Sequence, residues 1–449
     1  MEIKLEQKDA ADWIYRGEGA ANLVLSYTGS STVFIGKVMR IQKVASNSSS
    51  RCLVDHTVLT EHETLLWREL EELISSPTKE SAELLYVQHV ISPLLGPEHV
   101  DAGTHVLVSR EFLESIEKKV ICQRPAWRVD AAKIDTQRNF VLLMSDHSLF
   151  PSGILNVGPC ISVEIKPKCG FLPSSRFIAE RNVIKRSTTR FRMHQVLKLH
   201  EREISELSQY DPLDIFSGSK ERIHKAINDL YNTPQNNFRV FLNGSIIFGG
   251  LGGGTNKTSC VIEKAFEDAL KGLIQADDGL RTRSFIELVA ETVYSSRVLD
   301  RLLEVQKLDN FDIEGAIHAY YNIISQPCMV CSELDEARLQ PRYASLHSIP
   351  LDESLKMVKD YLIAATAKDC SLMISFKPRE DTDFWSPYSS IYLKSTNQNF
   401  DYKVNFIDLD LKPLNKMETY YEKDKKILNS YVQAAETKHM KGDTLVMEA

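Results

Sequence analysis

The chain has 449 residues, of which 43% are hydrophobic and 26% are charged, and a formal net charge of -7 at pH 7. This composition is typical of an ordered protein with two or more lobes and excludes wholesale disorder. The negative net charge disfavours general affinity for nucleic acids or acidic membranes. Positive charge is concentrated between residues 161 and 199, where nine Lys and Arg residues accompany two acidic ones. A field of that sign would attract a polyanion.

The first residues, 1–13, are charged and lack the apolar core of a signal peptide. No apolar run approaches the roughly 18 residues that a membrane-spanning helix needs. Eight cysteines in a chain of this kind are expected to be reduced or metal-bound rather than paired in disulfides. We therefore expect a monomer in the cytosol, the nucleus or both, with no nucleic-acid or membrane partner.

The N-terminal region predicts three strands, over residues 13–16, 23–27 and 33–41. A glycine-containing turn, residues 17–22, joins the first two strands. Backbone amides of such a hairpin can cover nucleotide phosphates, and Lys37 and Arg40 could reach the same phosphates from the third strand. An ordinary turn with solvated cations is the alternative that these residues leave open.

Helices are predicted over residues 61–75 and 79–91 from leucines three and four residues apart, and strands over 106–108 and 141–144. Ser145, Asp146 and His147 follow the last of these strands and precede a loop. Such a position suits a hinge between two lobes.

Residues 160–170, Cys-Ile-Ser-Val-Glu-Ile-Lys-Pro-Lys-Cys-Gly, alternate between apolar and polar side chains and predict a half-buried strand. At about 3.3 Å per residue, Glu164 and Lys168 would lie about 13 Å apart on one face, with Lys166 between them. This span suits a nucleotide phosphate tail at one end and a second anion at the other. An exposed edge strand is the alternative, because Pro167 lacks a donor and lysines blunt sheet edges.

A helix predicted over residues 188–200 has Arg190, His194 and Lys198 on one face without acidic residues between them. A solvated basic stripe is the alternative interpretation. Further along the chain, the pattern predicts helices over residues 263–275, 283–308 and 313–324. It predicts a polar loop over residues 382–399.

Two aspartates stand where phosphoryl transfer requires carboxylates. Asp369 directly precedes a strand predicted over 372–376, and Asp408 ends a strand predicted over 404–407. One carboxylate would orient the attacking hydroxyl and the other would hold magnesium. The His-Arg-Asp and Asp-Phe-Gly signatures are absent from the sequence, which argues against an ordinary protein kinase.

The segment after Asp408 predicts a helix that begins near Pro413. Lys412, Lys416 and Tyr420 are spaced four residues apart and share one face, which suits phosphate recognition. A surface helix with solvated lysines is the alternative.

His318, Cys328, Cys331 and His347 form the pattern H-x9-C-x2-C-x15-H. The spacing predicts a tetrahedral zinc site at 318–347, and two reduced cysteines with unrelated histidines are the alternative. Because a zinc ion with four protein ligands has no open position, such a site would be structural rather than catalytic.

Residues 164–168, EIKPK, fit the ExKPK signature of inositol-pentakisphosphate 2-kinases. The similarity to the plant members runs nearly end to end through blocks in one order: RGEGAANLVL, GKVMRIQK, RPAWRVDAA, SDHSLF, EIKPKCGFLPSSRF, TPQNNFRVFLNG, AFEDALKG, AATAKDCSLMISF and DYKVNFIDLDLKPL. The resemblance implies ATP-dependent phosphorylation of the 2-hydroxyl of inositol 1,3,4,5,6-pentakisphosphate to the hexakisphosphate (phytate). It also implies ATP, Mg²⁺ and a structural Zn²⁺ as cofactors.

The implied fold class is α+β, with a two-lobed kinase-like arrangement. Residues 1–145 would form a smaller N-lobe with an antiparallel sheet that covers ATP. Residues 146–435 would form a larger mixed C-lobe with the zinc site, and 436–449 a loose tail.

The resemblance also implies roles for individual residues. ATP would be bound by Gly19, Ala20, Ala21, Asn22, Arg40, Ser145, Asp146, His147, Glu164, Lys166, Arg239 and Asp408. The inositol phosphates would be bound by Arg128, Lys168, Lys198, Asn236, Asp369, Lys412, Lys416 and Tyr420. Asp369 and Lys166 would be catalytic, Asp408 would hold Mg²⁺, and zinc would be held by His318, Cys328, Cys331 and His347. His194 and Trp127 lie in matched blocks, Trp127 with a packing or ring-contact role.

Three departures from the family pattern bear on these roles. Ala20 replaces a glycine, and Lys416 stands where relatives carry arginine and so lacks the planar fork that grips phosphate. Val44 and Ala45 follow Ile-Gln-Lys where a relative supplies a substrate-binding arginine. Our hypothesis is that Arg51 substitutes for it.

Two other functions are conceivable from the sequence. One is a non-catalytic sensor of inositol polyphosphates, which the intact aspartates and glycine hairpin disfavour. The other is a zinc-dependent nucleic-acid binder, which the net charge disfavours.

Overall fold

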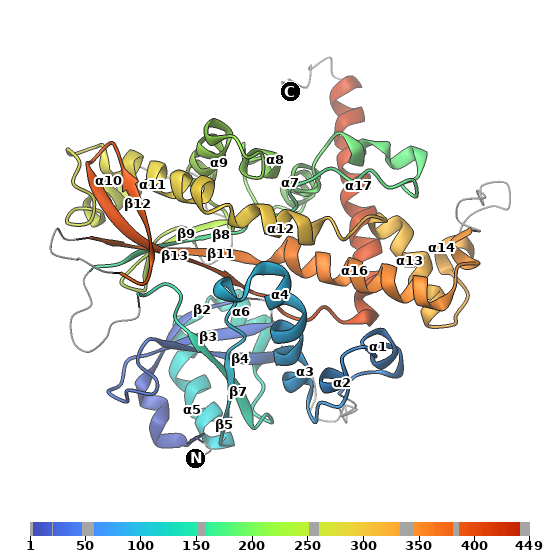
Figure 1. Cartoon of the computed structure of the whole chain (residues 1–449), viewed down its shortest axis with the longest axis horizontal. Helices are drawn as coiled ribbons and strands as arrows, with labels where there is room; N and C mark the ends of the chain where they lie inside the picture. The colour runs from blue at the N-terminus through green and yellow to red at the C-terminus, as the bar shows by residue number, and fades with distance from the viewer. Residues whose placement is uncertain are drawn as a thin grey trace.

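The computed structural model describes residues 3–19, 21–46, 58–150, 159–250, 260–332, 345–379 and 386–440. These residues form an α+β protein in which two β-sheets are accompanied by many helices (Figure 1). The first sheet belongs to the N-terminal part of the chain and the second to the remainder.

The first sheet has the strand order β1-β5-β7-β4-β3-β2, with β6 paired to β4. Its pairs are antiparallel except for β1 with β5, which is parallel. The strands are β1 (Lys4–Leu5), β2 (Trp13–Glu18), β3 (Asn22–Tyr27), β4 (Lys37–Ala45), β5 (Thr104–Val108), β6 (Ala132–Ile134) and β7 (Phe140–Ser145). The strand expected to begin at residue 33 begins at Lys37, because a turn with Gly36 at φ 71° precedes it.

Helix α5 (Arg110–Val120) packs its apolar side on this sheet. Ser109 caps the helix by accepting a hydrogen bond from the amide of Phe112 at 3.1 Å. Phe112 and Ile116 are buried with Trp13 of β2 in the core of the first sheet. The apolar spacing of α5 is thus used to close one side of the sheet.

The segment between β4 and β5 packs against the second sheet and its helices rather than on the first sheet. Its helices are α1 (Glu61–Leu66), α2 (Glu71–Ile74), α3 (Lys79–Tyr86), a π-turn over Val87–Ile91 and α4 (Ser92–Leu95). Tyr86 donates a hydrogen bond to Thr366 at 3.3 Å, and its ring lies in the core of the second sheet. The core therefore does not divide at residue 145, although the sequence assigned this segment to the first lobe.

The second sheet has the order β10-β9-β8-β11-β13-β12, and its pairs are antiparallel. Its strands are β8 (Ile161–Ile165), β9 (Phe238–Leu242), β10 (Ser245–Phe248), β11 (Ser371–Pro378), β12 (Ser389–Leu393) and β13 (Gln398–Ile407). Because β12 lies in the interval expected to be a polar loop, that part of the loop prediction is wrong.

Strand β8 lies in the interior of the second sheet, between β9 and β11, so the edge-strand alternative is wrong. Every residue of β8 is buried, including the polar ones. The hydroxyl of Ser162 donates a hydrogen bond to the carbonyl of Ser148 at 2.7 Å and lies 2.9 Å from the hydroxyl of Ser375. Alternation here separates two buried faces, one of which is polar and hydrogen-bonded.

The helices around the second sheet are α7 (Arg190–His200), α8 (Pro212–Ile215), α9 (Lys220–Asn232), α10 (Cys260–Ala269), α11 (Arg281–Ser296), α12 (Val298–Gln306), α13 (Asp312–Ile323), α14 (Met329–Ser332), α16 (Leu351–Asp369) and α17 (Met417–Met440). The single helix expected over 283–308 is broken at Arg297, whose φ of 57° is left-handed. Helix α17 continues to Met440, past residue 436 where a loose tail was expected. Among the described helices none is long and apolar enough to cross a bilayer.

Candidate active site and metal-binding cluster

A cavity of about 1620 Å³ is lined by residues of both sheets and of helices α7, α16 and α17. Most of the residues that the sequence singled out meet in this cavity. They are Gly19, Arg40, Arg128, Ser145, Asp146, His147, Glu164, Lys166, Lys168, His194, Lys198, Asn236, Arg239, Asp369, Asp408, Lys412 and Tyr420. Residues as far apart in the sequence as Gly19 and Tyr420 thus face one volume.

Five described residues from the sequence-based set for ATP and the substrate do not line the cavity. Lys37 is one of them, and its ammonium donates to the hydroxyl of Ser145 at 3.2 Å. Ala21 and Lys416 are exposed, and Asn22 is half-buried on β3. Trp127 is 48% exposed and stacks on the guanidinium of Arg128 at 4.1 Å. Ala20 and Arg51 lie outside the described residues.

Asp408 lies in the cavity at the end of β13, and we call the groups around it the Asp408 end. It is the first residue after β13 and has a φ of 62°, a left-handed conformation that is costly for a residue with a Cβ. Its carboxylate lies 3.2 Å from the ammonium of Lys166 and 3.8 Å from the guanidinium of Arg40. Burial opposes ionisation, but these cations outweigh it and keep the pKa of Asp408 below its usual value. Asp408 is therefore an ionised carboxylate, the kind of oxygen ligand that Mg²⁺ prefers.

Arg40 and Arg239 have carboxylate partners at the same end. Arg40 donates to both oxygens of Asp410, at 3.0 and 3.1 Å. Arg239 of β9 donates to Glu164 of β8 at 3.2 Å, which follows from their direct pairing in the ladder. These pairs hold the two guanidinium groups in positions that face the cavity. From there the guanidinium groups could contact phosphates.

The segment after β7 is held in place by hydrogen bonds of its own. Asp146 accepts from the amide of Ser148 at 2.9 Å, and the amide of Ser145 donates to Asp101 at 2.9 Å. Burial lowers the pKa of His147 to about 4, so its imidazole is neutral at pH 7. This segment presents backbone and uncharged ring atoms to the cavity, which suits a heterocycle better than a phosphate.

Asp369 lies in the cavity at the C-terminus of α16, close to Asp408 because Ser371 of β11 pairs with Ile407 of β13, and we call the groups around it the Asp369 end. Its carboxylate lies 3.2 Å from the ammonium of Lys412 and 3.8 Å from that of Lys168. Burial opposes ionisation of Asp369, but Lys412, Lys168 and Lys166 prevail and lower its pKa. An ionised carboxylate held by lysines can accept a hydrogen bond from an attacking hydroxyl while the lysines face anionic groups.

Lys168 reaches Asp369 by a route that the sequence did not predict. Strand β8 ends at Ile165, and Lys168 has a φ of 62°, so the chain turns before it and does not extend the strand. The expected regular spacing from Glu164 to Lys168 on one strand face is therefore wrong. Burial lowers the pKa of Lys168 to about 8.

The family model described as inositol-pentakisphosphate 2-kinase matches residues 15–426. The chain belongs to the inositol-pentakisphosphate 2-kinase family. It is 62% identical to the inositol-pentakisphosphate 2-kinase of Arabidopsis thaliana over 435 residues, which cover 96% of this chain and 95% of that protein. Relatives of the same name from Oryza sativa subsp. indica (51% identical, 97% of both chains) and Danio rerio (30% identical, 97% of this chain and 96% of that protein) are also similar.

Sequence reasoning missed two groups of residues in this member of the family. Lys423 of α17 lines the cavity and follows Tyr420 by three residues, so the helical spacing that singled out Lys412, Lys416 and Tyr420 could have included it. Glu18, next to the glycine hairpin, pairs with Lys43 and accepts from Arg124 at 2.9 and 3.0 Å, and all three side chains are buried. These partners lie far apart in the sequence, and nothing in the local pattern connects them.

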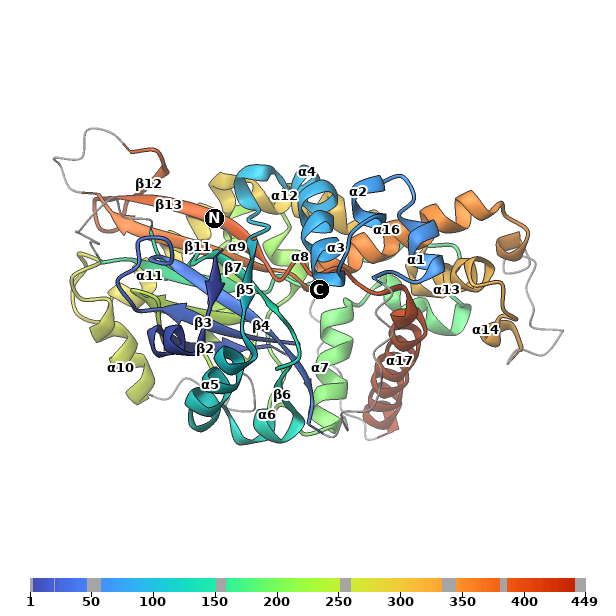
Figure 2. The ribbon, with the colours of Figure 1, turned by 90° about the horizontal axis from the view of Figure 1, so that it is seen from below.

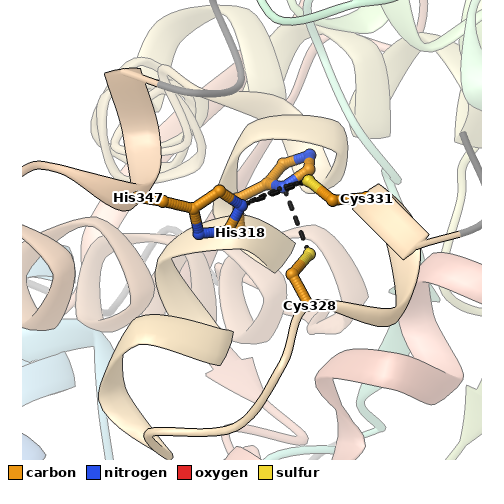
Figure 3. Close-up of side chains that lie close together, drawn as sticks. All are labelled: His318, Cys328, Cys331 and His347. Carbon is orange, nitrogen blue, oxygen red and sulfur yellow. Dashed lines mark hydrogen bonds between the residues drawn. The ribbon is translucent and has the colours of Figure 1, made fainter. Parts of the chain in front are cut away.

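The second candidate site in this kinase-family chain is the His/Cys cluster, formed by His318, Cys328, Cys331 and His347 (Figure 3). His318 lies on α13 and Cys331 on α14. The Nδ1 atom of His318 lies 3.4 Å from each sulfur and 3.2 Å from Nε2 of His347. Cys331 Sγ lies 3.2 Å from the same Nε2 atom. All four ligand atoms lie within 4.8 Å of one another.

These distances fit a tetrahedral ion. Zinc bonds of about 2.0–2.1 Å to nitrogen and about 2.3 Å to sulfur place neighbouring ligand atoms about 3.3–3.8 Å apart. Asn322 lies 3.0 Å from Nδ1 of His347, which directs Nε2 into the cluster. Burial raises the pKa of Cys331 to about 12, so a bound cation is needed to stabilise its thiolate. The His/Cys cluster is thus a possible metal site, as the spacing predicted.

Proposed function

We propose that the chain is an ATP-dependent inositol-pentakisphosphate 2-kinase that phosphorylates the 2-hydroxyl of inositol 1,3,4,5,6-pentakisphosphate to give the hexakisphosphate. Its fold is a two-lobed kinase-like fold, in which the first sheet covers ATP and the second sheet with its helices supplies the remaining groups. The observation that carries the proposal is the pair of ionised carboxylates, Asp408 and Asp369, each beside lysines in one cavity.

ATP binds at the Asp408 end. Gly19 covers the phosphates, Ala20, Ala21 and Asn22 remain predictions from the family resemblance, and Arg40, Lys166 and Arg239 contact the phosphates. The segment Ser145–His147 contacts adenine, and Glu164 contacts the ribose while it positions Arg239 at 3.2 Å. Asp408 would hold Mg²⁺, which supplies charge neutralisation on the phosphates when it is bound.

The inositol phosphate binds at the Asp369 end. Its phosphates are contacted by Arg128, Lys168, Lys198, Asn236, Lys412 and Tyr420, which line the cavity together with His194. Lys416 remains a prediction from the family resemblance alone. Asp369 accepts a hydrogen bond from the 2-hydroxyl and takes its proton as the hydroxyl oxygen bonds to the γ-phosphorus. The bond from that phosphorus to the bridging oxygen breaks and ADP leaves, and Lys166 stabilises the charge on the transferring phosphate.

Zn²⁺ is the ion that we propose for the His/Cys cluster. Two thiolates and two imidazoles prefer it, and a site with four protein ligands has no open position for substrate. No residue of the cluster is among those that line the cavity. Its role is therefore structural.

Product identification tests the proposed function. The purified chain is incubated with ATP labelled at the γ-phosphate and a panel of inositol phosphates, and the products are separated and identified. We expect label on the hexakisphosphate from the pentakisphosphate, and none with Asp369→Asn. Binding of the pentakisphosphate without any ATP consumption would instead support a sensor and refute the kinase.

A further inference from the structure

Lys185 is a buried lysine whose ammonium lies among three buried carboxylates. It contacts Asp312, and it lies 3.2 Å from Glu314 and 2.9 Å from Asp424. The three carboxylates are close enough to one another to hold a metal ion, and the ammonium occupies the space between them. We call Lys185, Asp312, Glu314 and Asp424 the Lys185 cluster.

The Lys185 cluster joins elements that are distant in the sequence. Lys185 lies in the 3-10 segment Glu180–Arg186, Asp312 and Glu314 lie at the start of α13, and Asp424 lies on α17. Asp424 also pairs with Arg190 at the start of α7. Burial alone would lower the pKa of Lys185, but Asp312, Asp424 and Glu314 raise it, so the ammonium stays charged.

These elements carry the groups that face the Asp369 end of the cavity. Helices α7 and α17 lie side by side (Figure 2). His194 and Lys198 line the cavity from α7, and Tyr420 and Lys423 line it from α17. The relative position of the two helices therefore sets the distances between these groups.

A second contact joins α17 to α13, the helix that carries Asp312 and Glu314. Tyr321 on α13 donates a hydrogen bond to Glu418 at the start of α17, at 2.9 Å. Helix α13 thus contacts α17 through Tyr321, where the cavity-lining part of α17 begins, and through the Lys185 cluster, in the middle of that part. Buried ions contribute little net stability, because desolvation offsets attraction, but they can fix one arrangement against others.

We propose that the Lys185 cluster is a positioning device that sets α17 against α7 and thereby sets the grip on the inositol phosphate. The proposal rests on the proposed function for the identity of that ligand. Lys185, Asp312 and Asp424 line the cavity, but their charges are paired with one another, so the cluster acts through the helices that it joins.

Asp424→Asn is the sharpest test, because charge and position predict opposite results. Removal of an acidic group beside a polyanion pocket strengthens the local positive field, so charge alone predicts a lower KM for the pentakisphosphate. Loss of the tie between α17, Lys185 and Arg190 predicts a KM that rises about tenfold, because small misplacements weaken aligned contacts. The KM for ATP is expected to change less than about twofold.

Glu267→Gln is the matched control. Glu267 of α10 is a half-buried carboxylate that also ties two helices, since it accepts from the amides of Arg281 and Thr282 at 2.9 and 2.8 Å. It is expected to lower stability without changing either KM. Hydrogen exchange of the full-length chain adds an independent readout: Asp424→Asn should speed exchange over residues 417–428, and Glu267→Gln should not.

A KM for the pentakisphosphate that falls or stays unchanged in Asp424→Asn, or that rises in proportion with the KM for ATP, would overturn the proposal. If that variant does not fold, Tyr321→Phe takes its place, because it removes only the hydroxyl hydrogen bond to Glu418. It is expected to raise the same KM alone, and an unchanged KM would overturn the proposal. Failure of the unmodified chain to make hexakisphosphate would instead refute the proposed function, and the exchange experiment would still test the tie.

Discussion

The two ends of the cavity differ in how their positive side chains are balanced. At the Asp408 end, Lys166, Arg40 and Arg239 have carboxylate partners at 3.2, 3.0 and 3.2 Å. At the Asp369 end, Lys412 and Lys168 share one carboxylate. Among the described residues, no ion pair is formed there by Lys198 or Lys423.

This difference follows the ligands that we propose. A nucleotide binds together with a metal ion that neutralises part of its charge. The positive side chains in its site therefore need fixed positions more than they need to be numerous. An inositol ring with five phosphates presents negative charge on all sides, and the lysines without ion pairs at that end can bind it. The comparison predicts that a substitution at one end impairs binding of one substrate without impairing binding of the other.

Asp369→Asn has the largest expected effect. The amide cannot take the proton of the 2-hydroxyl, so kcat should fall by about 10²–10⁴-fold. Affinity for the pentakisphosphate should be retained or increase, because a negative charge leaves that end. Single-turnover kinetics and calorimetric titration check the two parts, and substantial retained kcat would remove Asp369 from the proposed role.

Lys198→Met tests the excess charge at the Asp369 end. Loss of a charge-assisted contact of about 1.5–3 kcal/mol should raise the KM for the pentakisphosphate by about 10–100-fold. The same KM should rise with salt in the unmodified chain, because screening weakens accessible charges.

Arg192→Met on the same helix is the control for Lys198→Met. Arg192 pairs with Asp211 at 3.0 Å and does not line the cavity. Its effect should stay within about twofold, as for surface substitutions in general. Equal effects of the two variants would contradict a local role for Lys198.

Removal of metal from the His/Cys cluster should affect neither end directly. Cys331→Ser or a chelator is expected to lower Tm by about 5–10 °C, since a structural metal stabilises the folded state. Folded enzyme at low temperature should keep its kcat, because the cluster lies outside the cavity. Thermal unfolding with elemental analysis checks this, and an absence of stoichiometric zinc in purified protein would refute the site.

The smallest expected effect is a pH dependence at the Asp369 end. Burial lowers the pKa of Lys168 to about 8 in the free enzyme, so its ammonium is charged below that pH and loses its proton above it. The KM for the pentakisphosphate should rise several-fold from about pH 7 to about pH 9, beyond any change caused by ionisation of the ligand itself. Lys168→Arg stays charged and should show only the ligand's contribution; identical profiles would remove Lys168 from this role.

The sequence predicted which residues meet in one cavity better than it predicted the packing. Asp408 and Asp369 could be found because strand ends and helix ends are local features, and ExKPK marks Lys166 and Lys168. The His/Cys cluster followed from spacing. In contrast, the alternation in β8 could not reveal that both of its faces are buried, because a hydrogen-bonded polar face has the same pattern as an exposed one.

Contacts between distant segments were beyond reach for a different reason. Lys185 meets acids more than 120 residues away, and Arg124 meets Glu18 at a separation of 106 residues. A single sequence carries no signal for such pairs. The turn at Lys168 and the break at Arg297 are left-handed residues other than glycine, which local preferences do not anticipate.

The most direct test of a cavity with two distinct ends is to measure both KM values for Lys166→Met and Lys198→Met side by side. The structure predicts opposite effects. Lys166→Met raises the KM for ATP and leaves the KM for the pentakisphosphate nearly unchanged. Lys198→Met raises the KM for the pentakisphosphate and leaves the KM for ATP nearly unchanged. Variants that both impair the same substrate, or both substrates equally, would contradict the account.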